Sequence, residues 1–379
     1  MTDFEKFIDS KPMSYTKIDL ERMPKAFLSI SNNFNIPKII HVVGTNGKGT
    51  TGRFIAEMLQ KNGLKVGHYT SPHISEINER FWKDGEIISN SNLDKAYQYL
   101  NIYLSADFQK SLTYFEYTTL MNLPIYNNYD WLVLEAGLGG EFDATNVFRK
   151  ELSVFTPIGF DHQNFLGNTI SKIASTKLRS LENIAVISQQ KYDEVYKILD
   201  EIRLEKGSKI YKVQKENNIS FLEENFNTAK KCIEVLGFPN FHFNILDFNR
   251  PFGRFQKIAK NIVIDVGHNT LSAERVVQNM QKPFTLIYNS LDDKPSFEII
   301  KIFKDSINRV EIIKIYDERA LPKDILEKNL NDLKVNFKDF EKISHNENYL
   351  VFGSFKVVEQ FLKISNITDD LNIYKTTKK

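Results

Sequence analysis

The stretch Val42-Val-Gly-Thr-Asn-Gly-Lys-Gly-Thr-Thr51 decides the fold of this chain. A largely apolar run typical of a buried strand, Ile39–Val43, leads into it, and apolar residues at helical spacing follow over residues 55–59. A glycine-rich turn between a strand and a helix binds phosphates well, because its backbone N–H groups approach them closely and the helix N-terminus is partially positive. Lys48 adds a cation to this cradle. The stretch therefore predicts a site for a nucleoside triphosphate.

The cradle differs from the standard Walker pattern at both ends. That pattern requires a glycine where this chain has Val42, and a serine or threonine where it has Gly49. We therefore expect the hydroxyl of Thr50 to be the group that reaches Mg²⁺. The expected nucleotide-binding residues of the loop are Thr45, Asn46, Gly47, Lys48, Gly49 and Thr50.

The form Gly44-Thr-Asn-Gly-Lys-Gly-Thr50 resembles one family closely, the folylpolyglutamate synthase/dihydrofolate synthase branch of the Mur-type ATP-dependent amide ligases. Further motifs of that family follow along the chain in the family's order. They are Tyr69-Thr-Ser-Pro-His73, Thr113-Tyr-Phe-Glu116, Glu135-Ala-Gly-Leu-Gly-Gly140, Asp143-Ala-Thr-Asn146, Asp161-His162, Gly253-Arg-Phe-Gln256 and Asp265-Val-Gly-His-Asn269. Because these matches run in register, they are far more specific together than any one of them.

Composition and charge argue against several classes of protein. Lys and Arg number 50 against 48 Asp and Glu, a formal net charge of +2, so no basic field favours nucleic acid. No run approaches the roughly 18 apolar residues of a membrane span, and the first residues lack a signal-peptide pattern. The single cysteine, Cys232, is typical of a small apolar residue in a reduced compartment. We expect a cytoplasmic monomer whose partners are small molecules, with no nucleic acid and no membrane.

Two series of alternating strand-like and helix-like segments predict two α/β domains. Residues 1–250 contain short apolar runs that predict buried, mostly parallel strands at Ile39–Val43, Trp131–Leu134, Leu152–Phe155 and Ile184–Ile187. Residues 257–379 contain a second series, with strand-like runs at Ile262–Ile264, Phe284–Tyr288, Val310–Ile315 and Tyr349–Phe352. Pro251 and Gly253 mark the hinge between the two. We expect a P-loop domain that binds ATP and substrate, followed by a smaller Rossmann-like ligase domain, and the resemblance implies the Mur ligase arrangement.

Glu135 ends an apolar strand beside the cradle, where a carboxylate is a natural ligand or water-positioning group for Mg²⁺. A solvated loop residue is the alternative. His162 on its own would more often be structural, because Mg²⁺ prefers oxygen ligands. Family members use the matching histidine, serine and glutamate on one metal ion. The resemblance thus implies His162, Ser71 and Glu135 as ligands, with Thr50 close to the phosphates.

The resemblance implies a further metal ligand at Lys177. In the family the matching lysine is often carbamylated by CO₂, which turns a cation into an anion that ligates a second Mg²⁺. The family's Glu-Lys-Ala-Gly motif reads Thr176-Lys-Leu-Arg179 here, so a plain surface lysine is the alternative. The expected catalytic residues are Lys48, Glu135, His162 and Lys177.

Arg254 and Asp265 lie in or just after the hinge. An arginine there can hold the ATP phosphates, and a carboxylate can hold the ribose or the base. Family members use the matching pair to hold ATP, and His268 and Asn269 lie beside them in this sequence. An interdomain salt bridge is the alternative for Arg254.

The motifs Thr113-Tyr-Phe-Glu116 and Asp143-Ala-Thr-Asn146 resemble the pterin-binding side of the family's site. Aromatic rings give a flat heterocycle a stacking surface and carboxylates accept its ring N–H groups, although core packing is an equal alternative for the aromatic residues. Glu141 stands where the family usually has Arg, which reverses a charge beside this pocket. The expected substrate-binding residues are Thr113, Phe115, Glu116, Asp143 and Ala144.

The resemblance implies an ATP- and Mg²⁺-dependent ligase that joins L-glutamate to dihydropteroate or a folate through an acyl phosphate. The bifunctional dihydrofolate synthase/folylpolyglutamate synthase is the preferred form. A Mur-type ligase for cell-wall precursors is the first alternative. It is disfavoured because Gly44 lies so close to the start of the chain that we expect no UDP-binding domain before it. A degenerate ATP-binding regulator is the second alternative, supported only by Glu141 and the altered neighbourhood of Lys177.

Overall fold

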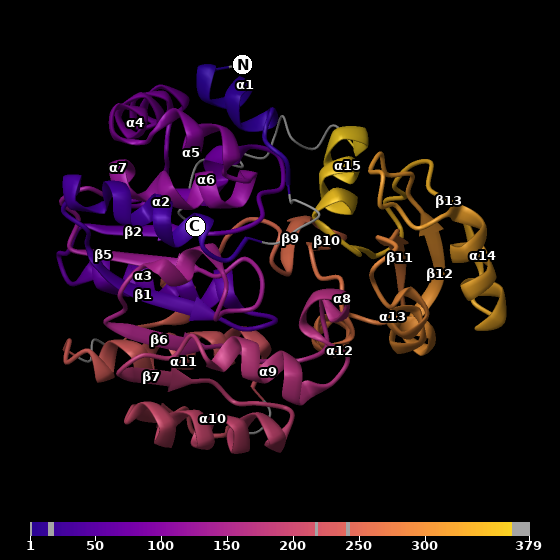
Figure 1. Cartoon of the computed structure of the whole chain (residues 1–379). Coiled ribbons are helices and arrows are strands. Elements are labelled where there is room, and N and C mark those ends of the chain that lie inside the picture. The colour runs from indigo at the N-terminus through magenta and orange to yellow at the C-terminus, as the bar shows by residue number, and fades with distance from the viewer. Residues whose placement is uncertain (1, 14–18, 217–218, 240–242, 366–379) are drawn as a thin grey trace. The chain divides into compact units, whose positions relative to one another are not determined.

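The computed structural model describes residues 2–13, 19–216, 219–239 and 243–365. The chain divides into two compact units, coloured along the chain in Figure 1. The first unit consists of Met1–Ile158, Ile170–Asn217 and Leu222–Asn249, and the second of Gly159–Thr169, Asn218–Phe221 and Arg250–Lys379. Each contains a mostly parallel sheet with helices, which confirms the α/β class expected from sequence.

Eight strands form the sheet of the first unit, in the order β4-β3-β2-β5-β1-β6-β7-β8. The pairs β2–β3 and β3–β4 are antiparallel, and the other pairs are parallel. The strands are β1 Lys38–Val43, β2 Val66–Tyr69, β3 Phe81–Lys83, β4 Glu86–Ile87, β5 Trp131–Glu135, β6 Leu152–Phe155, β7 Ile184–Ile187 and β8 Lys209–Lys212. Its helices are α1 Asp3–Asp9, α2 Arg22–Ile30, α3 Lys48–Lys61, α4 Asn90–Tyr103, α5 Ala106–Ser111, α6 Tyr114–Leu120, α7 Asn122–Ile125, α9 Ile170–Leu178, α10 Asp193–Lys206 and α11 Phe221–Val235.

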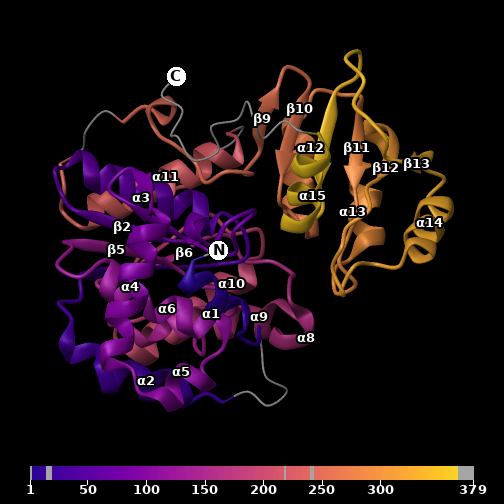
Figure 2. The ribbon, with the colours of Figure 1, turned by 90° about the horizontal axis from the view of Figure 1, so that it is seen from above.

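Alternation along the central strands sends side chains to two separate cores. Ile39 and Leu132 pack into the core shared with α1, α2, α4, α6 and α7. Ile40 and Val133 pack into the core shared with α3 and α11. Figure 2 shows α3 and α11 on one side of the sheet and α4 and α6 on the other. Helices therefore cover both faces, and ligand-binding loops are left at the carboxyl ends of the strands.

Six strands form the sheet of the second unit, in the order β13-β12-β11-β14-β10-β9. Only β9 is antiparallel to its neighbour among the described pairs of this sheet. The strands are β9 Gln256–Ala259, β10 Ile262–Asp265, β11 Phe284–Tyr288, β12 Ile307–Ile312, β13 Phe337–Asp339 and β14 Tyr349–Phe352. The helices are α8 Gln163–Leu166, α12 Thr270–Asn279, α13 Ser296–Phe303, α14 Lys323–Asp332 and α15 Phe355–Ser365.

The lengths of the helices and the position of the single cysteine can be compared with the sequence. None of the described helices is long and apolar enough to cross a membrane. Cys232 lies on α11 as a buried free thiol, as expected for a small apolar residue. Burial raises the pKa of this thiol.

Candidate active site

The predicted cradle links β1 to α3. Gly47 has φ of +84° and precedes the helix, in the left-handed region that only glycine adopts without strain. The N–H groups of Thr45 and Asn46 donate to the Pro157 carbonyl at 2.9 and 3.2 Å. The N-cap residue of α3 is Gly47, which has no side chain to cap the helix start. The first N–H groups of a helix have no partner within it, so this end of α3 can bind an anion.

Lys48, Glu135 and Ser71 come together at the carboxyl ends of three adjacent strands, β1, β5 and β2. The Lys48 ammonium donates to the Thr45 carbonyl at 3.2 Å and lies 3.9 Å from Glu135 Oε1. The Ser71 N–H donates to Glu135 Oε2 at 3.2 Å. The Glu135 side chain is only 3% exposed, which contradicts a solvated loop role. A buried carboxylate beside hydroxyl groups and a phosphate cradle fits the oxygen donors that Mg²⁺ prefers.

Thr50 and Lys177 border the same cradle. Thr50 is buried in the first turn of α3. Lys177 lies in the last turn of α9, is 5% exposed, and its ammonium donates to the Gly44 carbonyl at 3.0 Å. The alternative of a plain surface lysine is therefore wrong.

Asp143 holds the loop that follows β5. Its carboxylate accepts from the N–H of Leu138 at 2.7 Å, from the N–H of Thr145 at 2.9 Å and from the Thr145 hydroxyl. The Thr145 oxygen also lies 2.7 Å from Nε2 of the buried His41. Burial raises the pKa of Asp143, and these hydrogen bonds act in the opposite direction. Asp143 thus shapes the loop, and Ala144 follows it as a buried residue.

Thr145→Val should lower the free energy of unfolding by about 1–3 kcal/mol, because it removes the hydroxyl between two buried polar groups. Urea denaturation of the purified variant measures the loss. Thr145→Ser is the matched control, since it keeps the hydroxyl. A valine variant as stable as the wild type would show that the His41–Thr145–Asp143 chain does not hold this loop.

Glu116 and Thr113 form a capping box at the start of α6, in which each side chain binds the other's backbone N–H. The Glu116 carboxylate also accepts three hydrogen bonds from the Arg22 guanidinium, at 3.0, 3.1 and 3.3 Å. Phe115 is partly buried, and a side chain on Gly137 would lie 2.6 Å from its ring. The backbone of the glycine-rich loop after β5 therefore contacts the Phe115 ring.

The second unit carries Asp265 and Arg254 at the end of β10 and just before β9. Asp265 accepts from the N–H of Phe255 at 2.8 Å and of Gly267 at 2.7 Å. Burial raises the pKa of Asp265 above its usual value, and the nearby Arg254 guanidinium offsets only part of this rise. That guanidinium lies over the Phe355 ring, 4.8 Å from its centroid.

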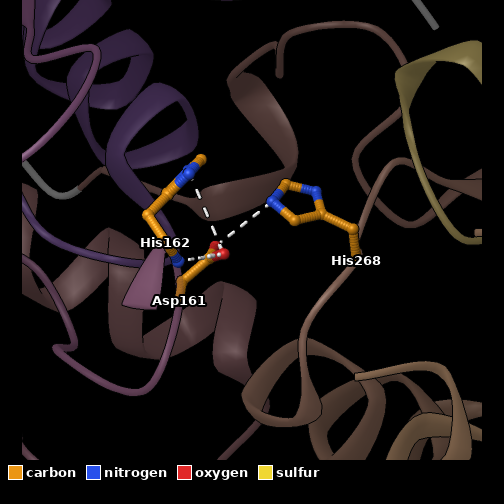
Figure 3. A group of neighbouring side chains, drawn as sticks. All are labelled: Asp161, His162 and His268. Atoms are coloured by element: carbon orange, nitrogen blue, oxygen red, sulfur yellow. Dashed lines mark hydrogen bonds and ion pairs between the residues drawn. The ribbon is translucent and has the colours of Figure 1, made fainter. Parts of the chain in front are cut away.

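Asp161 is the centre of a second cluster, shown in Figure 3 with His162 and His268 on either side of its carboxylate. The ligand atoms of these three residues lie within 4.8 Å of one another. Asn269 caps α12 and donates to the same carboxylate at 3.0 Å, and the Lys294 ammonium donates at 2.8 Å. Burial raises the pKa of Asp161, but His268, His162 and Lys294 outweigh it and hold the pKa well below its usual range.

Sequence reasoning did not include Arg22, His41, Thr145 or Lys294 among the site residues. Arg22 lies in the stretch Asp19-Leu-Glu-Arg-Met23 and Lys294 follows Asp293, outside the motifs that the sequence analysis used. His41 lies within an apolar strand and Thr145 within a loop motif, and neither has a local pattern that predicts its contact partner.

The strand, cradle and helix, with a lysine and a buried carboxylate beside them, define a nucleotide-binding enzyme of the P-loop class. The family model of the Mur ligase middle domain matches residues 42–263, more than half of the chain. The chain belongs to the Mur ligase family, in its folylpolyglutamate synthase branch.

Individual relatives agree with this assignment. The crystal structure of Helicobacter pylori folylpolyglutamate synthetase is 36% identical, covers 97% of this chain and 98% of its own, and has a TM-score of 0.78. The dihydrofolate synthase/folylpolyglutamate synthase of Buchnera aphidicola subsp. Schizaphis graminum is 29% identical over 375 residues, covering 86% of this chain and 87% of the relative. A Yersinia pestis bifunctional folylpolyglutamate synthase/dihydrofolate synthase, complexed with AMPPNP and Mn ion, shares the fold at a TM-score of 0.82 and 23% identity, covering 95% of this chain and 96% of its own.

Proposed function

We propose that this ligase forms an amide between the carboxylate of dihydropteroate or a folate and the amino group of L-glutamate, with cleavage of ATP to ADP and phosphate. The observation that carries the proposal is the position of Lys48 and the buried Glu135 beside the cradle, 3.9 Å apart. The relatives named dihydrofolate synthase/folylpolyglutamate synthase support the choice of substrates.

The chain's own residues suit a reaction in which the carboxylate first becomes an acyl phosphate. The N–H groups of Thr45 and Asn46 are engaged with Pro157, so the N–H groups at the start of α3, residues 47–50, suit the phosphates. We keep Thr45 and Asn46 as nucleotide contacts on the basis of the family resemblance. Lys48 neutralises charge that develops on the transferred group. A bound Mg²⁺ supplies further charge neutralisation at the phosphates. Thr50, Ser71 and Glu135 offer the oxygen ligands for it, and we keep His162 and Lys177 as ligands on the basis of the family resemblance.

The remaining assignments follow the resemblance. We propose ATP contacts for Arg254, Asp265, His268 and Asn269, and substrate contacts for Thr113, Phe115, Glu116, Asp143 and Ala144. We also keep residues 1–250 as the ATP- and substrate-binding domain and residues 257–379 as the ligase domain. Because the single cysteine, Cys232, is a free thiol, as is usual in a reducing compartment, we propose that the enzyme works in the cytoplasm, which fractionation of cells expressing it would test.

Phosphate release tests the reaction directly. The purified protein is incubated with ATP, Mg²⁺ and L-glutamate, and either dihydropteroate or tetrahydrofolate is added in separate assays. Release with both acceptors identifies the bifunctional enzyme, and release with one identifies a single activity. ATP binding without release in either assay would overturn the proposal in favour of a degenerate regulator, and release only with cell-wall precursors would assign another Mur-type ligase.

Lys177→Ala should lose nearly all ligase activity and regain part of it with added formate or acetate. The physical reason is that a carbamylated lysine supplies an anion to the metal, and a small carboxylate can replace that anion in the space left by the side chain. Initial rates with and without added carboxylate measure the effect. Lys172→Ala, an exposed lysine on the same helix, is the control. Full activity of Lys177→Ala would contradict the carbamylation proposal.

A further inference from the structure

Four donors surround the carboxylate of Asp161, whose side chain is 7% exposed. Oδ1 accepts from the Lys294 ammonium at 2.8 Å and from the backbone N–H of His162 at 2.8 Å. Oδ2 accepts from the Asn269 amide at 3.0 Å and lies 3.2 Å from His268 Nε2. Both oxygens of this buried group are therefore occupied by hydrogen-bond donors from the chain itself.

This occupancy argues against Asp161 as a metal ligand, although Figure 3 shows it between two histidines. A divalent ion bound to Oδ1 would lie close to the Lys294 ammonium, and two cations at that separation repel strongly in a buried site. The carboxylate instead has the surroundings of a group that fixes other residues in place. Its Oδ1 binds both the His162 backbone and the Lys294 side chain, and its Oδ2 is held by the Asn269 and His268 side chains.

The hydrogen bonds of the Asp161 carboxylate join three segments of the second unit that are separate in sequence. The segment Gly159–Thr169 belongs to this unit, although the residues before and after it in sequence belong to the first. Asn269 starts α12 after β10, and Lys294 lies between β11 and α13. His162 has φ of +50°, so its backbone is held in a conformation that non-glycine residues seldom adopt. The Asp161 hydrogen bond to this backbone thus ties His162 to two loops at the carboxyl ends of β10 and β11.

We propose that Lys294 is a positioning residue for His162, acting through Asp161. The Lys294 side chain is 5% exposed and lies 3.2 Å from Asp293 as well as 2.8 Å from Asp161. Without its ammonium, one oxygen of Asp161 loses its charged partner, and the carboxylate can turn away from the His162 backbone. The inference rests on the proposed function, in which His162 is a metal ligand. Groups that orient metal ligands in this way typically change metal affinity by about 10–100-fold when removed.

The experiment measures Mn²⁺ binding by electron paramagnetic resonance in the presence of AMPPNP, alongside ligase kinetics. Lys294→Met should weaken Mn²⁺ binding by about 10–100-fold and raise the metal requirement, while KM for L-glutamate stays within about twofold. Lys294→Arg should retain Mn²⁺ binding within a few-fold, because the guanidinium keeps the charged donor. Lys323→Met, which removes an exposed lysine paired with Asp339, should bind Mn²⁺ like the wild type.

Each outcome decides between the inference and its alternatives. A folded Lys294→Met that binds Mn²⁺ as the wild type does overturns it, even if the wild type is an active ligase. If Lys294→Met does not fold, Lys294→Gln, which keeps an uncharged donor, takes its place in the same measurement. If neither variant folds, Lys294 serves stability and the positioning role is wrong. An inactive wild type with every substrate pair overturns the proposed function itself, which is a separate result.

Discussion

Lys48→Ala should reduce ligase turnover by about 10²–10³-fold while leaving the protein folded. The ammonium of Lys48 is held at the cradle by the Thr45 carbonyl at 3.2 Å, with Glu135 3.9 Å away. Phosphoryl transfer depends on cations placed where negative charge develops, and alanine supplies none. Alanine also favours the helical conformation, so α3 should begin where it does in the wild type.

The measurement is the initial rate of phosphate release with saturating ATP, together with circular dichroism to confirm the fold. Lys25→Ala is the matched control, because Lys25 is an exposed lysine paired with Glu21 in the same unit. Activity of Lys48→Ala within about tenfold of the wild type, roughly 1.4 kcal/mol of barrier, would show that the cradle is not the site of phosphoryl transfer.

Glu135→Gln should raise the Mg²⁺ concentration needed for half-maximal activity by at least about tenfold, with a much smaller change in KM for L-glutamate. The amide is the same size and still accepts the hydrogen bond from the Ser71 N–H, but it loses the negative charge that a divalent ion requires. The substitution should therefore weaken Mg²⁺ binding far more than it disturbs the packing around β5.

Titration of Mg²⁺ and of L-glutamate in separate series measures the two requirements. Glu86→Gln, at an exposed position on β4 of the same sheet, is the control. Equal changes in both requirements would point to general destabilisation and would remove Glu135 from the set of metal ligands.

The strands show how much of the fold follows from local pattern. Seven of the eight strands expected from apolar runs lie within two residues of the predicted bounds, and the eighth, expected at Val310–Ile315, is found at Ile307–Ile312. Most strands that were not predicted are short, like β3 and β13, or partly exposed, like β8 with its sequence Lys-Ile-Tyr-Lys. The buried strand β2 was also not predicted, because its sequence Val-Gly-His-Tyr is not an apolar run. Pairing with neighbouring strands defines such segments, and a short or mixed stretch of sequence does not show that pairing.

For two carboxylates of the site, the sequence predicted a role but not the residues that contact them. Sequence motifs singled out Glu116 and Asp143 as substrate ligands. In the structure, Arg22 and the capping box contact Glu116, while Leu138 and Thr145 hold Asp143. A motif identifies the residue type that chemistry requires, but the partners of a buried group depend on which other segments pack against it. Those partners decide whether a carboxylate faces a ligand or supports a loop.

The sequence by itself determined the cradle, because a strand, a glycine turn and the start of a helix are neighbours along the chain and their geometry follows from local conformation. It also determined that Glu135 ends a strand at the same sheet edge. Only the tertiary structure decided that Lys177 donates to the Gly44 carbonyl and that Lys294 holds Asp161, pairs that are each 133 residues apart. Contacts at that separation depend on how distant segments pack, because a buried charge takes whichever partner the fold brings to it.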